Sequence, residues 1–181
     1  MRCKKIVATG KDIIDIAERA IGAPYKFGVV VDYYSPDSVN GPFDCAEFVT
    51  WAITQAVGHT HGTINVRVGK DGRIIENAWT EAWYDEGVKD HEHYTISTDE
   101  QGDEHNHLLY MALLRPGVVL LRRQRTVGLG RRRRKIPGHV ALSIGDGKNV
   151  IEARRGGVGV RSALNRVWDL TIWLGCVDYG R

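Results

Sequence analysis

The sequence has 181 residues, a formal net charge of +3 at pH 7, 43% hydrophobic residues and 26% charged residues. This length fits one domain, and the composition is that of a globular protein rather than of a disordered or fibrous chain. No apolar run is long enough to span a bilayer, and the basic residues 1–6 are not followed by an apolar stretch. We therefore expect neither a transmembrane segment nor a signal peptide in this chain.

The three cysteines, Cys3, Cys45 and Cys176, lie far apart in the sequence. They form no CxxC metal motif and no disulfide framework, and an odd number leaves at least one thiol free. A catalytic thiol is therefore allowed by the cysteine count.

The first predicted helix covers residues 11–21, where Ile13 and Ile16 begin an apolar stripe at helical spacing. Gly22 and Pro24 end it. Residues 33–42 are rich in Ser, Pro, Asp, Asn and Gly, a composition typical of a loop.

A second helix is predicted to begin at Asp44, a good N-cap residue, and to end at Gly58. Glu47 stands three residues after Asp44, as a capping box requires. Cys45 therefore lies in the first turn of the helix, on its apolar stripe.

The second half of the chain is predicted to be mainly β. Alternating apolar residues at 64–68 and a turn at 70–72 indicate a hairpin. A short helix is expected around Trp79 and Trp83. The rest of the region up to residue 110 is predicted to be a polar loop. Strands follow at residues 118–121, 139–144, 149–153, 158–160 and 172–177. Helices followed by antiparallel strands predict an α+β fold.

Cys45 is a candidate nucleophile because the first turn of a helix favours the thiolate form. The alternative is a structural cysteine, since free cysteines are often buried.

His139 is the candidate partner of Cys45. A two-residue turn at Asp146 and Gly147 pairs Ala141 with Glu152, which makes His139 and Glu152 diagonal neighbours on one face of the hairpin. A carboxylate there can fix the histidine tautomer and favour the imidazolium form. The alternatives are a histidine bonded to water or backbone and a glutamate that is solvated or paired with Arg154 or Arg155.

Several segments resemble one family, the NlpC-type cell-wall cysteine peptidases, which are papain-like. They are G-A-P-Y at residues 22–25, F-D-C-A-E-F-V at 43–49, R-P-G-V-V-L at 115–120, and G-H-V-A-L at 138–142 with G-D-G at 145–147. The resemblance covers about residues 12–51 and 114–160. It implies a papain-like fold, with N-terminal helices packed on an antiparallel sheet.

The resemblance also implies roles for individual residues. Cys45 matches the nucleophile, His139 the base and Glu152 the polar residue that orients the histidine. Tyr25 matches a tyrosine beside the nucleophile. Asp44 and Ala46 flank Cys45 and are expected to border the substrate, with backbone N–H groups at the helix start available to an oxyanion.

Three features depart from the family pattern. The orienting residue is usually His, Asn or Gln rather than Glu, and Val118 replaces a usual Asp. Residues 59–107 have no counterpart that can be matched. We therefore expect residues 1–181 to form a single domain with a variable insertion at about 59–107.

The implied activity is hydrolysis of amide bonds in peptidoglycan stem peptides, without a cofactor. This action on the cell wall would require export, injection or delivery by a phage, since no signal peptide is expected. Two alternatives stay open: a cysteine acyltransferase or amidase acting on another amide, and a non-catalytic domain that binds the wall or an anionic polymer.

Two other patterns carry further hypotheses. The pairs His59/His61, His91/His93 and His105/His107 have a spacing that suits metal ligands on a strand, although polar loops also contain such histidines. The spacing alone assigns no metal site to them. The basic run Arg131, Arg132, Arg133, Arg134 and Lys135 lacks interleaved aromatic residues, so it predicts a solvated loop that could contact an anionic polymer rather than a nucleic-acid site.

Overall fold

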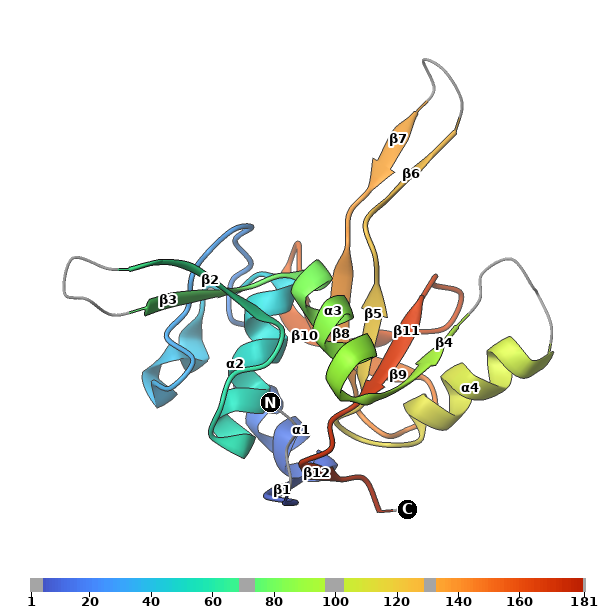
Figure 1. Ribbon diagram of the computed structural model, residues 1–181, viewed down its shortest axis with the longest axis horizontal. Coiled ribbons are helices and arrows are strands. Elements are labelled where there is room, and N and C mark those ends of the chain that lie inside the picture. Colours follow the sequence, from blue (N-terminus) through green and yellow to red (C-terminus); the bar gives the residue numbers. More distant parts are fainter. Residues whose placement is uncertain (1–4, 69–73, 97–102, 129–132, 181) are drawn as a thin grey trace.

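A six-stranded antiparallel sheet lies at the centre of the structure, in the order β10-β9-β8-β5-β11-β4 (Figure 1). The computed structural model describes residues 5–68, 74–96, 103–128 and 133–180. Two further hairpins, β2-β3 and β6-β7, extend from this body, and the short parallel pair β1-β12 lies near both chain ends (Figure 1).

The elements have the following bounds. The helices are α1 Gly10–Glu18, α2 Cys45–Val57, α3 Thr80–Asp90 and α4 Asp103–Leu113, with a short 3₁₀ helix at Pro36–Asn40. The strands are β1 Ala8–Thr9, β2 Thr63–Val68, β3 Ile74–Ala78, β4 Glu92–Thr95, β5 Val119–Arg122, β6 Arg125–Val127, β7 Arg134–Ile136, β8 His139–Ser143, β9 Asn149–Arg154, β10 Gly157–Ser162, β11 Leu170–Trp173 and β12 Val177–Asp178. Within the described ranges, none of the helices combines the length and apolarity needed to cross a membrane.

Both faces of the central sheet are buried. On one face α1 and α2 pack against β8 and β9, where Val140, Leu142 and Ile151 join the main core. On the other face Leu113 of α4 and Trp168 belong to a second, smaller core. The predicted α+β class, with N-terminal helices packed on an antiparallel sheet, is confirmed.

Helix α2 begins and ends where the sequence predicts. The Asp44 side chain accepts hydrogen bonds from the backbone N–H groups of Ala46 and Glu47, each at 3.0 Å, and Gly58 closes the helix with a φ of 82°. A positive φ suits glycine, which has no Cβ to clash.

The predicted capping box in α2 is wrong in one half. The Glu47 side chain is fully buried, and it accepts hydrogen bonds from the backbone N–H groups of Val31 (3.1 Å) and Ala78 (3.0 Å). Glu47 therefore fastens the preceding loop and the end of β3 to α2 instead of capping the helix.

The β8-β9 hairpin has the predicted register. Leu142 pairs with Ile151 and Ser143 with Val150, and the Asp146 side chain accepts hydrogen bonds from two backbone N–H groups in the turn. This register places His139 and Glu152 on the same face of the sheet.

The region between α2 and β5 is more regular than predicted. The expected hairpin forms as β2-β3, although its turn at 70–72 lies outside the described residues. The expected short helix is α3, which continues to Asp90, and β4 and α4 occupy part of the predicted loop. The polar composition of this region does not predict β4 or α4. Strand β4 is stabilised by its pairing with β11, and helix α4 by the apolar side chains that it packs against the sheet.

Candidate active site

Cys45 and the β8-β9 hairpin meet at the start of α2. Cys45 is the first residue of the helix and is partly buried. Helix α2 packs against β8, and hydrogen bonding to the backbone N–H of Val140, the residue that follows His139, lowers the pKa of the Cys45 thiol. The structure therefore brings the candidate nucleophile beside the strand that carries the candidate base, and no direct hydrogen bond joins the Cys45 sulfur to the His139 ring.

The side chains of His139 and Glu152 form a direct hydrogen bond. The His139 Nε2 atom lies 2.5 Å from the Glu152 Oε2 atom, and the Glu152 side chain is fully buried. Glu152 is therefore not a solvated charge. Arg154, a partner considered from the sequence, is 3.6 Å away from its other oxygen.

Arg166 is a site residue that the sequence did not reveal. Its guanidinium binds both Glu152 oxygens, at 3.1 and 2.7 Å, and lies 4.7 Å from the centre of the Trp168 ring. This bidentate geometry is the strong form of an arginine–carboxylate pair. Arg166 lies between β10 and β11, where no periodicity singles out one arginine, so only the folded chain identifies it.

The protonation states follow from these contacts. Burial alone would raise the pKa of Glu152, but the hydrogen bonds from His139 and Arg166 outweigh it and lower the pKa to about 2. Burial lowers the pKa of His139, the hydrogen bond and charge of Glu152 oppose this, and the nearby charges of Arg166 and Arg122 add to the lowering. The His139 ring is therefore neutral at neutral pH, whereas the sequence favours the imidazolium form.

Cys45 also differs from the expectation. Burial raises the pKa of its thiol to about 12, the negative charge of Asp44 adds to the rise, and the Val140 N–H opposes it. The desolvation penalty for the thiolate is larger here than the stabilisation that the thiolate gains from the N-terminus of the helix. The resting pair is thus a neutral thiol and a neutral imidazole.

The tautomer of His139 is set by Glu152. An ionised carboxylate only accepts hydrogen bonds, so the neutral ring donates its Nε2–H and keeps a lone pair on Nδ1. Nδ1 is then the atom able to take a proton from a thiol.

Tyr25 lies near the candidate nucleophile. An isolated β-bridge pairs the Tyr25 backbone with that of Phe43, two residues before Cys45. Burial raises the pKa of the Tyr25 hydroxyl, and the negative charges of Cys45, when it is ionised, and of Asp44 add to this rise, which requires both residues to be close.

Asp44 and Ala46 border the thiol through the backbone. Asp44 accepts a hydrogen bond from Gly28 N–H at 3.2 Å, in addition to those that cap α2, and so ties the preceding loop to the helix start. The Ala46 N–H is one of those capping donors, at 3.0 Å from Asp44.

Comparison with known proteins finds similarity in structure only. No family model matches the sequence, and no curated protein matches it either. Among solved structures, the chain is similar to the crystal structure of the NlpC/p60 domain of the peptidoglycan hydrolase SagA, with 20% sequence identity and a TM-score of 0.49 over 92% of this chain and 99% of that chain.

Proposed function

We propose that this chain is a cysteine peptidase that hydrolyses amide bonds of peptidoglycan stem peptides through Cys45, His139 and Glu152. The supporting observation is that Cys45, at the start of α2, lies close to the strand that carries His139, while the His139 Nε2 atom is bonded to a buried carboxylate. The substrate class rests on the motifs around Cys45 and His139.

The first step starts from neutral partners. His139 Nδ1 takes the thiol proton as the Cys45 sulfur attacks the carbonyl carbon, and the imidazolium that forms is stabilised by Glu152. Because the pKa of the thiol is raised to about 12, His139 acts as a general base rather than as half of a preformed ion pair. The protonated ring then gives its proton to the leaving amine, and the acyl group stays on sulfur.

The second step releases the acid. His139, neutral again, takes a proton from the water that attacks the thioester, and the imidazolium then gives this proton to the leaving Cys45 sulfur. We assign the oxyanion contact to the backbone N–H of Cys45, because the N–H of Ala46 already donates to Asp44.

Positive charge near the thiol supports an acidic substrate. Arg122 lies close enough to Cys45 to interact with its ionised form, and Arg155 does so with ionised Tyr25. Guanidinium groups bind carboxylates well, so these two arginines are suited to the free carboxylates of a stem peptide.

The test is digestion of purified peptidoglycan, with mass analysis of the released fragments. The wild type should release fragments with new amino and carboxyl ends, and Cys45→Ala should release none above background. His139→Gln should reduce kcat by about 10³-fold or more, since it removes the base. His93→Gln is the matched control, because His93 lies on the outer strand β4 and should keep full activity.

Other products would identify the alternatives. Transfer of the acyl group to an added amine without hydrolysis would indicate an acyltransferase. Binding of the wall by wild type and Cys45→Ala alike, without any product, would indicate a binding domain. Either result, or release of fragments by folded Cys45→Ala, overturns the proposal.

A further inference from the structure

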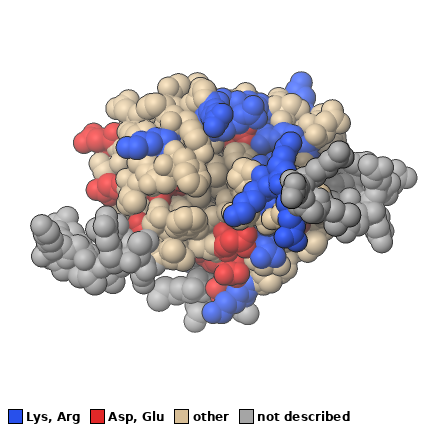
Figure 2. Space-filling model, turned by 90° about the horizontal axis from the view of Figure 1, so that it is seen from above, with Lys and Arg blue, Asp and Glu red and all other residues tan. Residues whose placement is uncertain are grey.

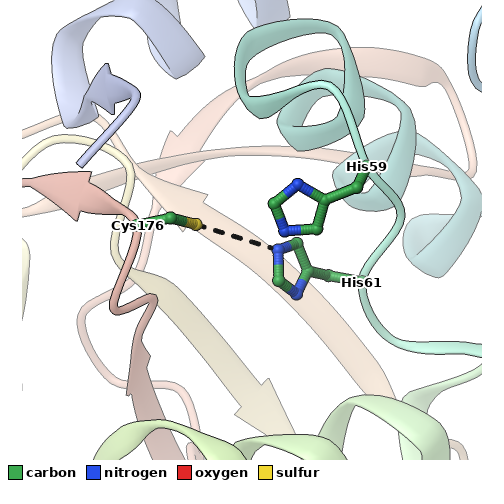
Figure 3. Close-up of side chains that lie close together, drawn as sticks. All are labelled: His59, His61 and Cys176. Atoms are coloured by element: carbon green, nitrogen blue, oxygen red, sulfur yellow. Dashed lines mark hydrogen bonds between the residues drawn. The ribbon is translucent and has the colours of Figure 1, made fainter. Parts of the chain in front are cut away.

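A second cluster of reactive side chains lies apart from Cys45 and His139. It contains His59 and His61, from the link between α2 and β2, and Cys176, from the link between β11 and β12 (Figure 3). One nitrogen or sulfur atom from each of the three lies within 4.8 Å of the others, and Cys176 Sγ is 4.0 Å from His61 Nε2. His61 and Cys176 are almost fully buried.

Neighbouring groups fix the orientation of both histidine rings. His59 Nδ1 lies 3.2 Å from the carbonyl of Val57, and the other ring nitrogen of His59 points toward His61 (Figure 3). His61 Nδ1 lies 2.5 Å from a carboxylate oxygen of Glu86. Each Nδ1 therefore donates its hydrogen to an oxygen, which leaves the lone pair on Nε2.

Glu86 is itself held in place. It accepts hydrogen bonds from the Gly62 backbone N–H at 2.6 Å and from His91 Nε2 at 3.0 Å, as well as from His61. A carboxylate that receives the second ring N–H of a histidine is the usual outer support of a metal-binding histidine. His91 thus belongs to this support and not to the ligand set.

We propose that His59, His61 and Cys176 bind a zinc ion, with Glu86 as the residue that positions His61. Two imidazole nitrogens and one thiolate are a donor set typical of Zn²⁺. Binding deprotonates the Cys176 thiol, and the proton is released to solvent. Water completes the tetrahedron.

The observed spacing is close to that of a zinc site. Bonds of about 2.0 Å to nitrogen and about 2.3 Å to sulfur place neighbouring ligand atoms on the order of 3.5 Å apart. The 4.0 Å between Cys176 Sγ and His61 Nε2 therefore needs only a small contraction. A cavity of about 360 Å³ is lined by residues next to this cluster, among them His91, Gly175 and Val177.

The ion would act as a structural clip. His61 and Cys176 are 115 residues apart in the sequence, and β12, which follows Cys176 directly, pairs with β1. Zinc binding would fasten the C-terminal segment to the link after α2.

Cobalt substitution provides the test. Apoprotein of the full chain is titrated with Co²⁺, and we expect about one ion per chain with a sulfur-to-cobalt charge-transfer band in the near ultraviolet. Cys176→Ser should lose this band, and His59→Gln should weaken zinc binding by about tenfold or more. A chelator should lower the Tm of the zinc-loaded wild type by about 5 °C or more, and should not change the Tm of Cys176→Ser.

Two controls separate this site from other thiols and histidines. Cys45→Ser and His93→Gln should keep the cobalt spectrum and the chelator effect. If Cys176→Ser fails to fold, His59→Gln decides, because His59 is only partly buried. Absence of stoichiometric binding by the wild type overturns the proposal, as does a band that survives in Cys176→Ser or vanishes in Cys45→Ser.

Discussion

At the residue scale, the protonation of His139 is set by a balance of charges in a buried environment. Glu152 favours the imidazolium form, whereas burial and the charges of Arg166 and Arg122 favour the neutral ring. Arg166 donates hydrogen bonds to both oxygens of Glu152, and its positive charge offsets part of the negative charge that would otherwise stabilise the His139 imidazolium. A histidine acts as a general base only when it is neutral, so under the proposed function this arrangement would favour activity down to mildly acidic pH.

Arg166→Met should raise the pKa of His139. The substitution removes a positive charge and frees Glu152 to stabilise the imidazolium, so the protonated, inactive form persists to higher pH. The acid limb of kcat/KM should move upward by about 1 pH unit. Arg154→Met is the matched control, because Arg154 is half-exposed and 3.6 Å from Glu152, and its profile should not move. Equal shifts in both variants would contradict a specific role for Arg166.

Asp44→Asn should make Cys45 more reactive. The amide keeps an oxygen to cap α2 but removes a negative charge that raises the pKa of the thiol. We expect alkylation of Cys45 by iodoacetamide at pH 8, followed by mass spectrometry, to be about threefold faster or more. Asp37→Asn, which changes an exposed carboxylate in the 3₁₀ helix, should leave the rate unchanged. An unchanged or slower rate in Asp44→Asn would count against the electrostatic explanation.

At the element scale, the two N-terminal helices are fixed by different means. The capping box that the sequence suggests for α2 is formed in α1 instead, where Thr9 and Asp12 bond each other's backbone N–H. Helix α2 uses Asp44 alone as its cap, and the Glu47 carboxylate serves tertiary contacts. The same spacing of residue types therefore produced two local structures, because Glu47 is surrounded by other segments and Asp12 is not.

Gly10→Ala should destabilise the packing of α1. A Cβ at residue 10 would stand 1.9 Å from the carbonyl oxygen of Pro116, so the backbone of one segment must move. We expect the free energy of unfolding, measured by urea denaturation, to fall by about 1–3 kcal/mol. Glu18→Ala, at an exposed position of the same helix, should change it by about 0.5 kcal/mol or less. Similar values for both variants would contradict the predicted close approach.

At the scale of the whole molecule, basic side chains are prominent on the face seen in Figure 2. Most of the Lys and Arg atoms in this view lie in its centre and right half, while acidic residues lie at the left edge and in the lower middle, where they adjoin basic ones. The hairpin β6-β7 projects from the body and carries Arg134 and Lys135 on β7, so these two are strand residues rather than part of the predicted loop (Figure 1). Arg133 is exposed beside them, and Arg131 and Arg132 lie outside the described residues.

Removing charge from this hairpin tests the predicted contact with an anionic polymer. The triple substitution of Arg133, Arg134 and Lys135 by Gln should weaken binding to poly-L-glutamate by about tenfold at low salt, because the contact is electrostatic. The same triple variant should cleave a small soluble stem peptide at the wild-type rate. The control is Gln at the exposed residues Lys11, Arg19 and Lys148, which removes the same charge elsewhere. Equal weakening by both triples would show that net charge matters and the hairpin does not.

The sequence by itself determined the features that depend on local chemistry. The position of Cys45 at a helix start follows from Asp44 and Gly58, which cap the helix through neighbouring atoms. The pairing of β8 with β9 follows from the turn at Asp146 and the alternation of side chains, and it places His139 by Glu152. These sequence patterns determine local structure over a few residues, so they apply in any fold that contains the segment.

The tertiary structure decided everything that depends on burial and on distant partners. The neutral state of the Cys45 thiol, the clamp of Arg166 on Glu152 and the meeting of His61 with Cys176 each require segments far apart in the chain. Desolvation and charge act through space, so neighbours in sequence do not reveal them.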